Sequence, residues 1–169
     1  RKLEGKFDKI VSVEMIEAVG ADYYGEFFEC CSKLLKPKGS MALQAITISD
    51  QHFERARRSV DFIQRHVFPG SCIPSVTALI SAATRSSDLR VAELEDIGPH
   101  YVKTLATWRE ALRARWSDAM AMGYSDDFLR QWEFYFAYCE GGFAERHISD
   151  VHMLLQRPGV RPPITARPI

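Results

Sequence analysis

The stretch "FDKIVSVEMIEAVG", residues 7–20, joins a β-branched apolar run to two carboxylates and a glycine. Residues 7–13 have no helical period, which predicts a strand buried on both faces, as in parallel sheets. Glu14 and Glu17 follow at the carboxyl end of this strand, where open α/β sheets bind their ligands. Either acid could instead cap the following helix, whose first turn is partially positive. Position alone leaves both roles open, and it slightly favours Glu17 as the group that faces a cleft.

A helix and a second strand complete a βαβ unit around this stretch. Residues 21–36 repeat apolar side chains every three or four positions, which predicts an amphipathic helix that Pro37 and Gly39 stop. Residues 40–48 predict the next strand. Strand, helix and strand in this order call for parallel pairing through a right-handed crossover, so the fold class is α/β.

The next segment, "SDQHFERARRSVDFIQRHVFPGSCIPS" (residues 49–75), predicts a charged helix followed by a turn rich in Pro and Gly. We expect it to be an insertion that covers one end of the sheet as a lid. Its arginines could meet lipid phosphates, although a solvated charged face is the more common role for any one of them. These arginines are Arg55, Arg57, Arg58 and Arg65.

Further elements alternate along the remaining chain. A helix is predicted from near Val76, a strand over 89–94, and a helix that begins near Pro99 or His100. A long aromatic helix over 126–143 and a last strand over 147–156 follow. The Pro-rich residues 159–169 hold no core residues and predict a disordered tail, which leaves one domain over 1–158.

Composition excludes several classes of function. The 22 basic residues balance 22 acidic ones, so no net field favours nucleic acid as a partner. The four cysteines form no CxxC pair and the five histidines have no paired-ligand spacing, so we expect no metal site and a reducing cytoplasm. No apolar run reaches the roughly 18–20 residues of a membrane span.

Several side chains could contribute to a site near Glu17. Gln44 lies at the carboxyl end of the second strand beside the backbone of Ile46, and its amide can both donate and accept. His100 and Tyr101 lie at a helix start, where a packed or surface role is the more common one. The aromatic series of the 126–143 helix covers more than one face, so core packing is its default role and an acyl chain is an alternative partner. This series includes Trp132, Phe134, Tyr135, Phe136, Tyr138 and Phe143.

Six stretches in order resemble the carboxyl-terminal part of cyclopropane-fatty-acyl-phospholipid synthases and the related mycolic acid cyclopropane synthases. They are "FDKIVSVEMIEAVG" (7–20), "LLKPKGSMALQAITI" (34–48), "DFIQRHVFPGSCIPS" (61–75), "DIGPHYVKTLATWR" (96–109), "QWEFYFAYCEGGF" (131–143) and "VHMLLQRP" (151–158). The resemblance implies a class I S-adenosylmethionine-dependent methyltransferase fold, of which this chain holds strands four to seven. The family's glycine-rich cofactor loop has no counterpart in these residues, so we expect a fragment that is inactive alone, with an open sheet edge prone to aggregation or homodimer pairing.

The resemblance also assigns roles to residues. Family members transfer a methyl cation to a cis double bond of a phospholipid acyl chain, and a proton is then removed as the ring closes. The implied base is a bound bicarbonate held by Glu17, Gln44, the Ile46 backbone and Tyr101. Val13 and Glu14 match a cofactor-contacting position. Trp132, Tyr135, Tyr138 and Phe143 are the expected acyl-chain contacts.

Three departures from the family pattern concern the same site. Ala18 stands where many bacterial members have histidine, Gln44 stands where several have histidine, and Glu14 stands where glycine is frequent. The expected setting is cytoplasmic, at the inner face of the membrane. A sibling that leaves a methyl or methylene branch, and a non-catalytic lipid-binding domain, are the alternatives.

Overall fold

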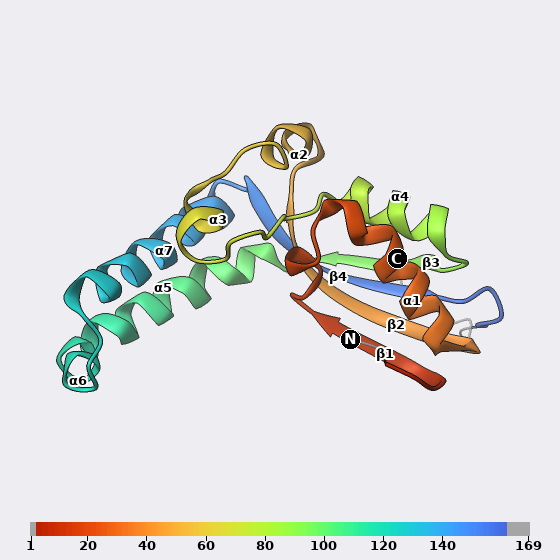
Figure 1. Cartoon of the computed structure of the whole chain (residues 1–169), viewed down its shortest axis with the longest axis horizontal. Coiled ribbons are helices and arrows are strands. Elements are labelled where there is room, and N and C mark those ends of the chain that lie inside the picture. Colours follow the sequence, from red (N-terminus) through yellow and green to blue (C-terminus); the bar gives the residue numbers. More distant parts are fainter. Residues whose placement is uncertain (1–2, 162–169) are drawn as a thin grey trace, which may run out of the picture.

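The computed structural model describes residues 3–161, which form a sheet lobe and a projecting helical arm (Figure 1). The strands are β1 (Phe7–Val13), β2 (Leu35–Ile48), β3 (Arg90–Asp96) and β4 (Ile148–Gln156). Their spatial order is β1-β2-β4-β3, with β1 parallel to β2 and β4 antiparallel to both of its neighbours. The predicted α/β class and its βαβ unit are confirmed.

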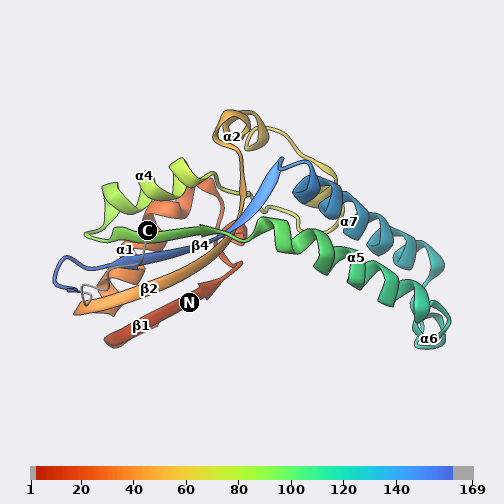
Figure 2. The ribbon, with the colours of Figure 1, turned by 180° about the vertical axis from the view of Figure 1, so that it is seen from behind.

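The helices divide between the two parts. The sheet lobe and lid contain η1 (Ile16–Ala18), η2 (Ala21–Tyr23), α1 (Tyr24–Leu34), α2 (Asp50–Ala56), α3 (Phe62–His66) and α4 (Val76–Ser86). The arm contains α5 (Gly98–Ala114), α6 (Trp116–Ala121) and α7 (Asp126–Ala144). The view from behind shows that α1 and α4 lie on one face of the sheet and leave the other open (Figure 2). None of the helices between residues 3 and 161 has the length and apolar character needed to cross a bilayer.

The main core lies between the sheet and the α1–α4 pair. Its strand residues alternate along β2 and β4, so that each contributes every second side chain to the covered face. Neighbouring strands bring these residues opposite one another, as in the pairs Leu43 with Met153 and Met41 with Leu155. Phe28 of α1 and Leu79 of α4 close the core from above and are fully buried.

The expectation that β1 is buried on both faces is wrong. Val11 is 70% exposed and Val13 is 57% exposed. The reason is that β1 is an edge strand, and in the described part of the chain no helix covers the far face of the sheet. Apolar composition predicted the strand correctly, but it could not show which neighbours would cover it.

Two helix predictions are also corrected. The helix predicted over 21–36 begins with the 3-10 turn η2 and ends at Leu34, because Leu35 is extended and already pairs with Phe7. Pro37 and Gly39 consequently lie within β2. Residues 49–75, the expected lid, contain two short helices, α2 and α3, instead of one charged helix, and Asp61 begins the second by capping the backbone of Gln64. Residues 162–169 of the predicted tail lie outside the described residues.

The arm joins β4 at both of its ends. At the start of α5, a side chain on Gly98 would collide with Ser149 and approach the Asp150 nitrogen to 3.0 Å. The Ile97 N–H donates to the Asp150 carbonyl at 2.8 Å. At the end of α7, a side chain on Gly142 would approach Ile148 to 3.1 Å. A Cβ at position 98 would therefore force the strand or Ser149 to move, whereas a Cβ at position 142 would require a small shift of the Ile148 side chain.

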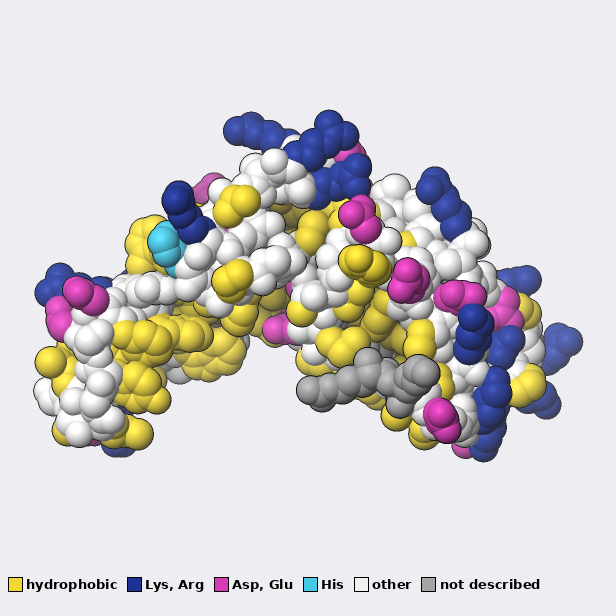
Figure 3. All heavy atoms as spheres, in the orientation of Figure 1, with side chains coloured by type: hydrophobic (Ala, Val, Ile, Leu, Met, Phe, Trp, Pro, Cys, Tyr) yellow, Lys and Arg dark blue, Asp and Glu magenta, His cyan; other side chains and the backbone are white. Residues whose placement is uncertain are grey.

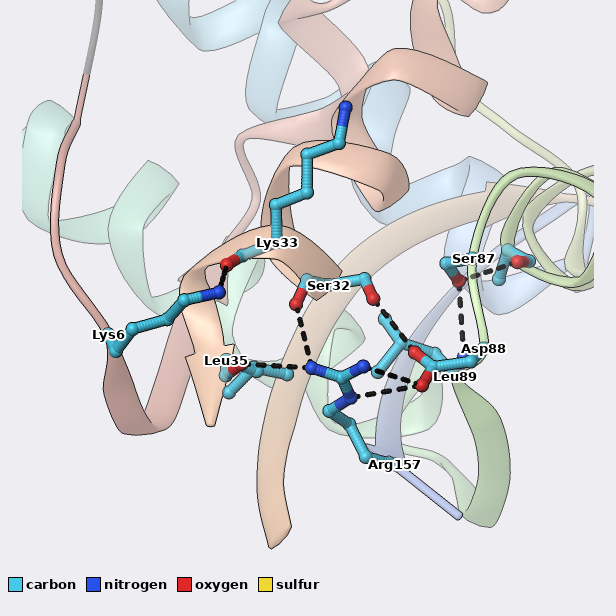
Figure 4. A network of polar contacts seen from close by, with 9 residues as sticks. Lys6, Ser32, Lys33, Leu35, Ser87, Asp88, Leu89 and Arg157 are labelled. Carbon is cyan, nitrogen blue, oxygen red and sulfur yellow. Dashed lines mark hydrogen bonds and ion pairs between the residues drawn. The ribbon is translucent and has the colours of Figure 1, made fainter. Parts of the chain in front are cut away.

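The opposite end of the sheet is closed by an arginine network (Figure 4). Arg157, just after β4, donates to the Leu35 carbonyl at 3.0 Å and to the Asp88 carboxylate at 2.7 Å. Ser32 of α1 donates to the other Asp88 oxygen at 2.8 Å. The network therefore ties the end of β4 to the last turn of α1 and to the turn between α4 and β3.

Candidate active site

Glu17 lies in the η1 turn after β1 and points back toward β2. Its Oε1 accepts a hydrogen bond from the Ile46 backbone N–H at 2.6 Å, while its Oε2 is buried and has no partner among the described residues. The side chain is 9% exposed, and burial raises its pKa from the ordinary 4.5 to about 7. A carboxyl group in this state can take up or release a proton near neutral pH.

Residues 72–74, here called the lid strap, lie at the end of the expected lid and fix the backbone of Glu17. The Cys72 N–H donates to the Glu17 carbonyl at 2.7 Å, and the Tyr24 hydroxyl donates to the Cys72 carbonyl at 2.7 Å. The Ile48 N–H donates to the carbonyl of Pro74 at 2.9 Å. These bonds bring the end of the predicted lid, residues 49–75, against the turn that carries the acid.

Gln44 of β2 is the centre of a polar cluster beside Glu17. Its Nε2 lies 2.8 Å from Glu14 Oε1, 3.0 Å from the Tyr101 hydroxyl and 2.7 Å from Asp150 Oδ2. The Tyr101 hydroxyl donates to the same Glu14 oxygen. The Gln44 oxygen lies 3.1 Å from His152 Nε2, which must donate because the oxygen is an acceptor. The structure thus brings together the predicted Glu14, Gln44 and Tyr101.

Asp150 is the site residue that sequence reasoning missed. It is fully buried on β4, and its Oδ1 has no partner among the described residues. Burial raises its pKa from the ordinary 3.8 to about 6. The available signal was an acid inside the apolar alternation of residues 148–156, and this pattern was interpreted only as a strand.

The four expected acyl-chain contacts are divided between different surroundings. Phe143 is buried and its ring stacks on Tyr101 with centroids 5.0 Å apart, so it supports the polar cluster directly. Tyr135 meets Phe68 of the lid at 6.1 Å, and Trp132 packs on Tyr135 at 5.3 Å. Tyr138 is 44% exposed beside α3. Figure 3 shows apolar side chains along the arm where it faces the hollow between the two lobes.

The polar cluster does not leave a free place for bicarbonate. The expected donors, Gln44 and Tyr101, already bind the Glu14 carboxylate. The Ile46 N–H is likewise bound to Glu17. The expected bicarbonate stays a prediction, and this donor set disagrees with it.

Of the two residues expected to contact S-adenosylmethionine, only one is placed where it suits that contact. Val13 presents an exposed apolar side chain at the carboxyl end of β1, which suits contact with a ligand. Glu14 turns its carboxylate to Tyr101 and Gln44 instead. Val13 therefore fits a cofactor contact, and Glu14 fits the polar cluster.

Comparison with known proteins gives this site its family context. Residues 1–153 match the family described as mycolic acid cyclopropane synthetase. The chain belongs to the mycolic acid cyclopropane synthetase family. Within it, the chain is 36% identical over 159 residues to the tuberculostearic acid methyltransferase of Mycobacterium tuberculosis, covering 94% of this chain and 37% of that protein. It is 33% identical over 150 residues to the cyclopropane-fatty-acyl-phospholipid synthase of Escherichia coli, covering 88% and 37%.

The fold of this cyclopropane synthetase family member agrees with solved relatives. A mycolic acid cyclopropane synthase complexed with SAH and CTAB matches with a TM-score of 0.84 at 28% identity, over 92% of this chain and 57% of that one. The fold is therefore the Rossmann-like methyltransferase fold that the sequence predicted. The chain spans little more than a third of the curated relatives' length.

Proposed function

We propose that the gene product containing this chain transfers a one-carbon unit from S-adenosylmethionine to the cis double bond of unsaturated phospholipid acyl chains at a membrane surface. The observation that supports this most is the buried carboxyl of Glu17, whose pKa is raised to about 7 at the carboxyl end of β1. Relatives that share this stretch are named for fatty acyl methylation and cyclopropanation.

Different residues of the chain would bind the acyl chain, transfer protons and exclude water. S-adenosylmethionine, when bound, supplies an electrophilic methyl group. The apolar side of the arm would hold the acyl chain, because it presents hydrophobic side chains toward the hollow between the arm and the sheet lobe. Glu17 would move protons, since its pKa near neutrality suits both uptake and release. Phe143 and the lid strap would exclude water from this group.

Two products are consistent with this reaction. A proton lost with ring closure gives a cyclopropane, whereas a hydride shift followed by loss of a methyl proton leaves a methylene branch. A saturated methyl branch needs, in addition, a hydride from a separate reductant. A branch-forming product deserves testing because the relative at 36% identity is a tuberculostearic acid methyltransferase. Nuclear magnetic resonance of fatty acids from cells that express the protein distinguishes them, because only the ring product gives the upfield protons of a cyclopropane.

The decisive variant is Glu17→Gln in the full-length gene product. The amide keeps the shape but cannot exchange the proton, so we expect product formation to fall by ~10²–10⁴ while the protein stays folded. Tyr101→Phe removes one hydrogen bond and should cost less, about 10- to 100-fold. Single-turnover rates and melting temperatures on the same preparations measure both effects.

The alternative roles predict different outcomes. If Glu17 only caps a helix, Glu17→Gln loses about 1 kcal/mol of stability and stays fully active, which contradicts the proposal. If the protein only binds lipid, the wild type forms no product with S-adenosylmethionine and unsaturated phospholipid vesicles.

A further inference from the structure

The backbone of Glu14 has an unusual conformation. Its φ is +45°, in the left-handed region that favours glycine, and among described non-glycine residues only Arg146 shares a positive φ. The Glu14 N–H donates to the Gln44 carbonyl at 2.9 Å and so continues the β1–β2 ladder past the end of the strand. This turn brings the side chain back over the sheet. A non-glycine residue held in this region motivates the hypothesis that its side chain has a function, which the contacts of Glu14 then test.

The Glu14 carboxylate lies among hydrogen-bond donors from two other elements of the fold. One oxygen accepts from both the Tyr101 hydroxyl and Gln44 Nε2, from α5 and β2 respectively. These are the two side-chain donors that the family resemblance implied for a bound bicarbonate. A carboxylate and a bicarbonate present similar planar pairs of oxygen atoms, so either could accept these hydrogen bonds.

The charges around the cluster oppose a second anion. Glu17 and Asp150 are the other acids there, and no Lys or Arg in the described part of the chain bonds to either of them. Burial is the largest cause of the raised pKa of both groups. Hydrogen bonds from the Ile46 backbone and from Gln44 lower the two pKa values, whereas the charge of Glu14 raises both. Another negative ion would therefore enter a site that already holds an excess of acid without a compensating cation.

We infer that Glu14 supplies the anion of this site from the chain itself, in the place where bicarbonate is expected. The inference rests on the proposed function for its chemical consequence. In that reaction the methyl group leaves the sulfonium of S-adenosylmethionine and forms a carbon–carbon bond, giving a carbocation. A C–H bond of the transferred methyl group then breaks, its electron pair forms the bond to the cationic carbon that closes the ring, and the proton passes to the Glu14 carboxylate.

Anion binding tests the inference without any reaction. The 169-residue chain is titrated with ¹³C-bicarbonate while the Gln44 side-chain amide signals are followed by nuclear magnetic resonance. We expect no saturable shift for the wild type and a saturable one for Glu14→Gly, with binding at least about tenfold tighter, because two donors are freed. Glycine also suits the φ of this position. Arg146→Gly is the matched control, since it relaxes the other left-handed residue and should gain nothing.

If Glu14→Gly fails to fold, a second variant and a second measurement still test the inference. Glu14→Gln keeps the shape without the charge, and either change should lower the pKa of Glu17 and Asp150, followed by carboxyl ¹³C titration. A wild type whose Gln44 signals shift as strongly as those of the glycine variant overturns the inference. So does a folded glycine variant that binds no bicarbonate, or a Glu14→Gln chain in which both pKa values are unchanged.

Kinetics on the full-length gene product separates this inference from the proposed function. The wild-type rate should be unaffected when bicarbonate is removed, whereas Glu14→Gly should lose ~10²-fold or more and recover with added bicarbonate. A wild-type rate that requires bicarbonate overturns the inference and leaves the methyltransferase proposal intact. An enzyme without turnover refutes the proposed function, while the anion titration still decides the inference.

Discussion

The two ends of the sheet treat acidic side chains in opposite ways. At the end closed by Arg157, the Asp88 carboxylate receives hydrogen bonds from Arg157 and Ser32. Partial burial alone would raise its pKa, but these bonds hold the pKa below the ordinary value. At the other end Glu17 and Asp150 are buried without a cation, and their pKa values rise to about 7 and about 6. At the Arg157 end, the ionised Asp88 carboxylate stabilises the fold through its hydrogen bonds. At the site end, the raised pKa values favour the protonated form of Glu17 and Asp150.

The largest expected effect is on the pH dependence of stability at the site end. Folded Glu17, with a pKa of about 7, keeps a proton that the unfolded chain releases near pH 4.5. The free energy of unfolding therefore falls as pH rises from about 4.5 to 7, by up to about 3 kcal/mol. In Glu17→Gln this contribution should disappear, and only the fall up to about pH 6 that the raised pKa of Asp150 contributes should remain. Urea unfolding of both chains across this range measures it, and parallel curves would contradict the raised pKa.

A smaller effect is expected at the Arg157 end. Arg157→Met removes the arginine donor from the Leu35 carbonyl and from the Asp88 carboxylate, which keeps only the bond from Ser32. This should cost about 1–2 kcal/mol, because Asp88 remains partly exposed. The loss should shrink as pH falls below the ordinary value of 3.8, because the unfolded Asp88 then takes up a proton while Arg157 keeps the pKa of the folded carboxyl lower. Urea unfolding at pH 3 and at pH 7 measures it. A loss of equal size at both values would assign the effect to packing alone.

The smallest effect is expected for an ion pair near the same network. Lys33 and Glu29 are one turn apart on α1 and lie 2.6 Å from each other, with side chains 69% and 50% exposed. Lys33→Gln should change the free energy of unfolding by less than about 0.5 kcal/mol, because water screens the pair. A loss as large as that of Arg157→Met would show that the arginine network is not distinct from surface charge.

Sequence predicted the fold where local pattern and packing agree. The α5, α7 and β4 segments were placed within about two residues, because their apolar periods coincide with the faces that pack. The exposure of β1 was not predictable, since it depends on the sheet order and on what covers the far face. The turn at Glu14 was not predictable either, because a positive φ at a glutamate is set by tertiary hydrogen bonds.

The candidate site was predicted in part for a similar reason. Glu17, Gln44 and Tyr101 come from motifs at the ends of elements, and the topology brings such ends together. Asp150 lies within β4, near its start, where pattern alone suggests core packing. Its role depends on a cross-strand neighbour more than a hundred residues away, Gln44, which no local window contains.

The glycine contacts at the root of the arm have a consequence for how this family can vary. Gly98 and Gly142 seat the two ends of the arm on the strand that also carries Asp150. Insertions or deletions at the distal α6 turn would therefore change the reach of the apolar surface without moving the acids. If the arm holds an acyl chain as proposed above, changes at its tip would alter chain-length preference separately from the proton chemistry at its base.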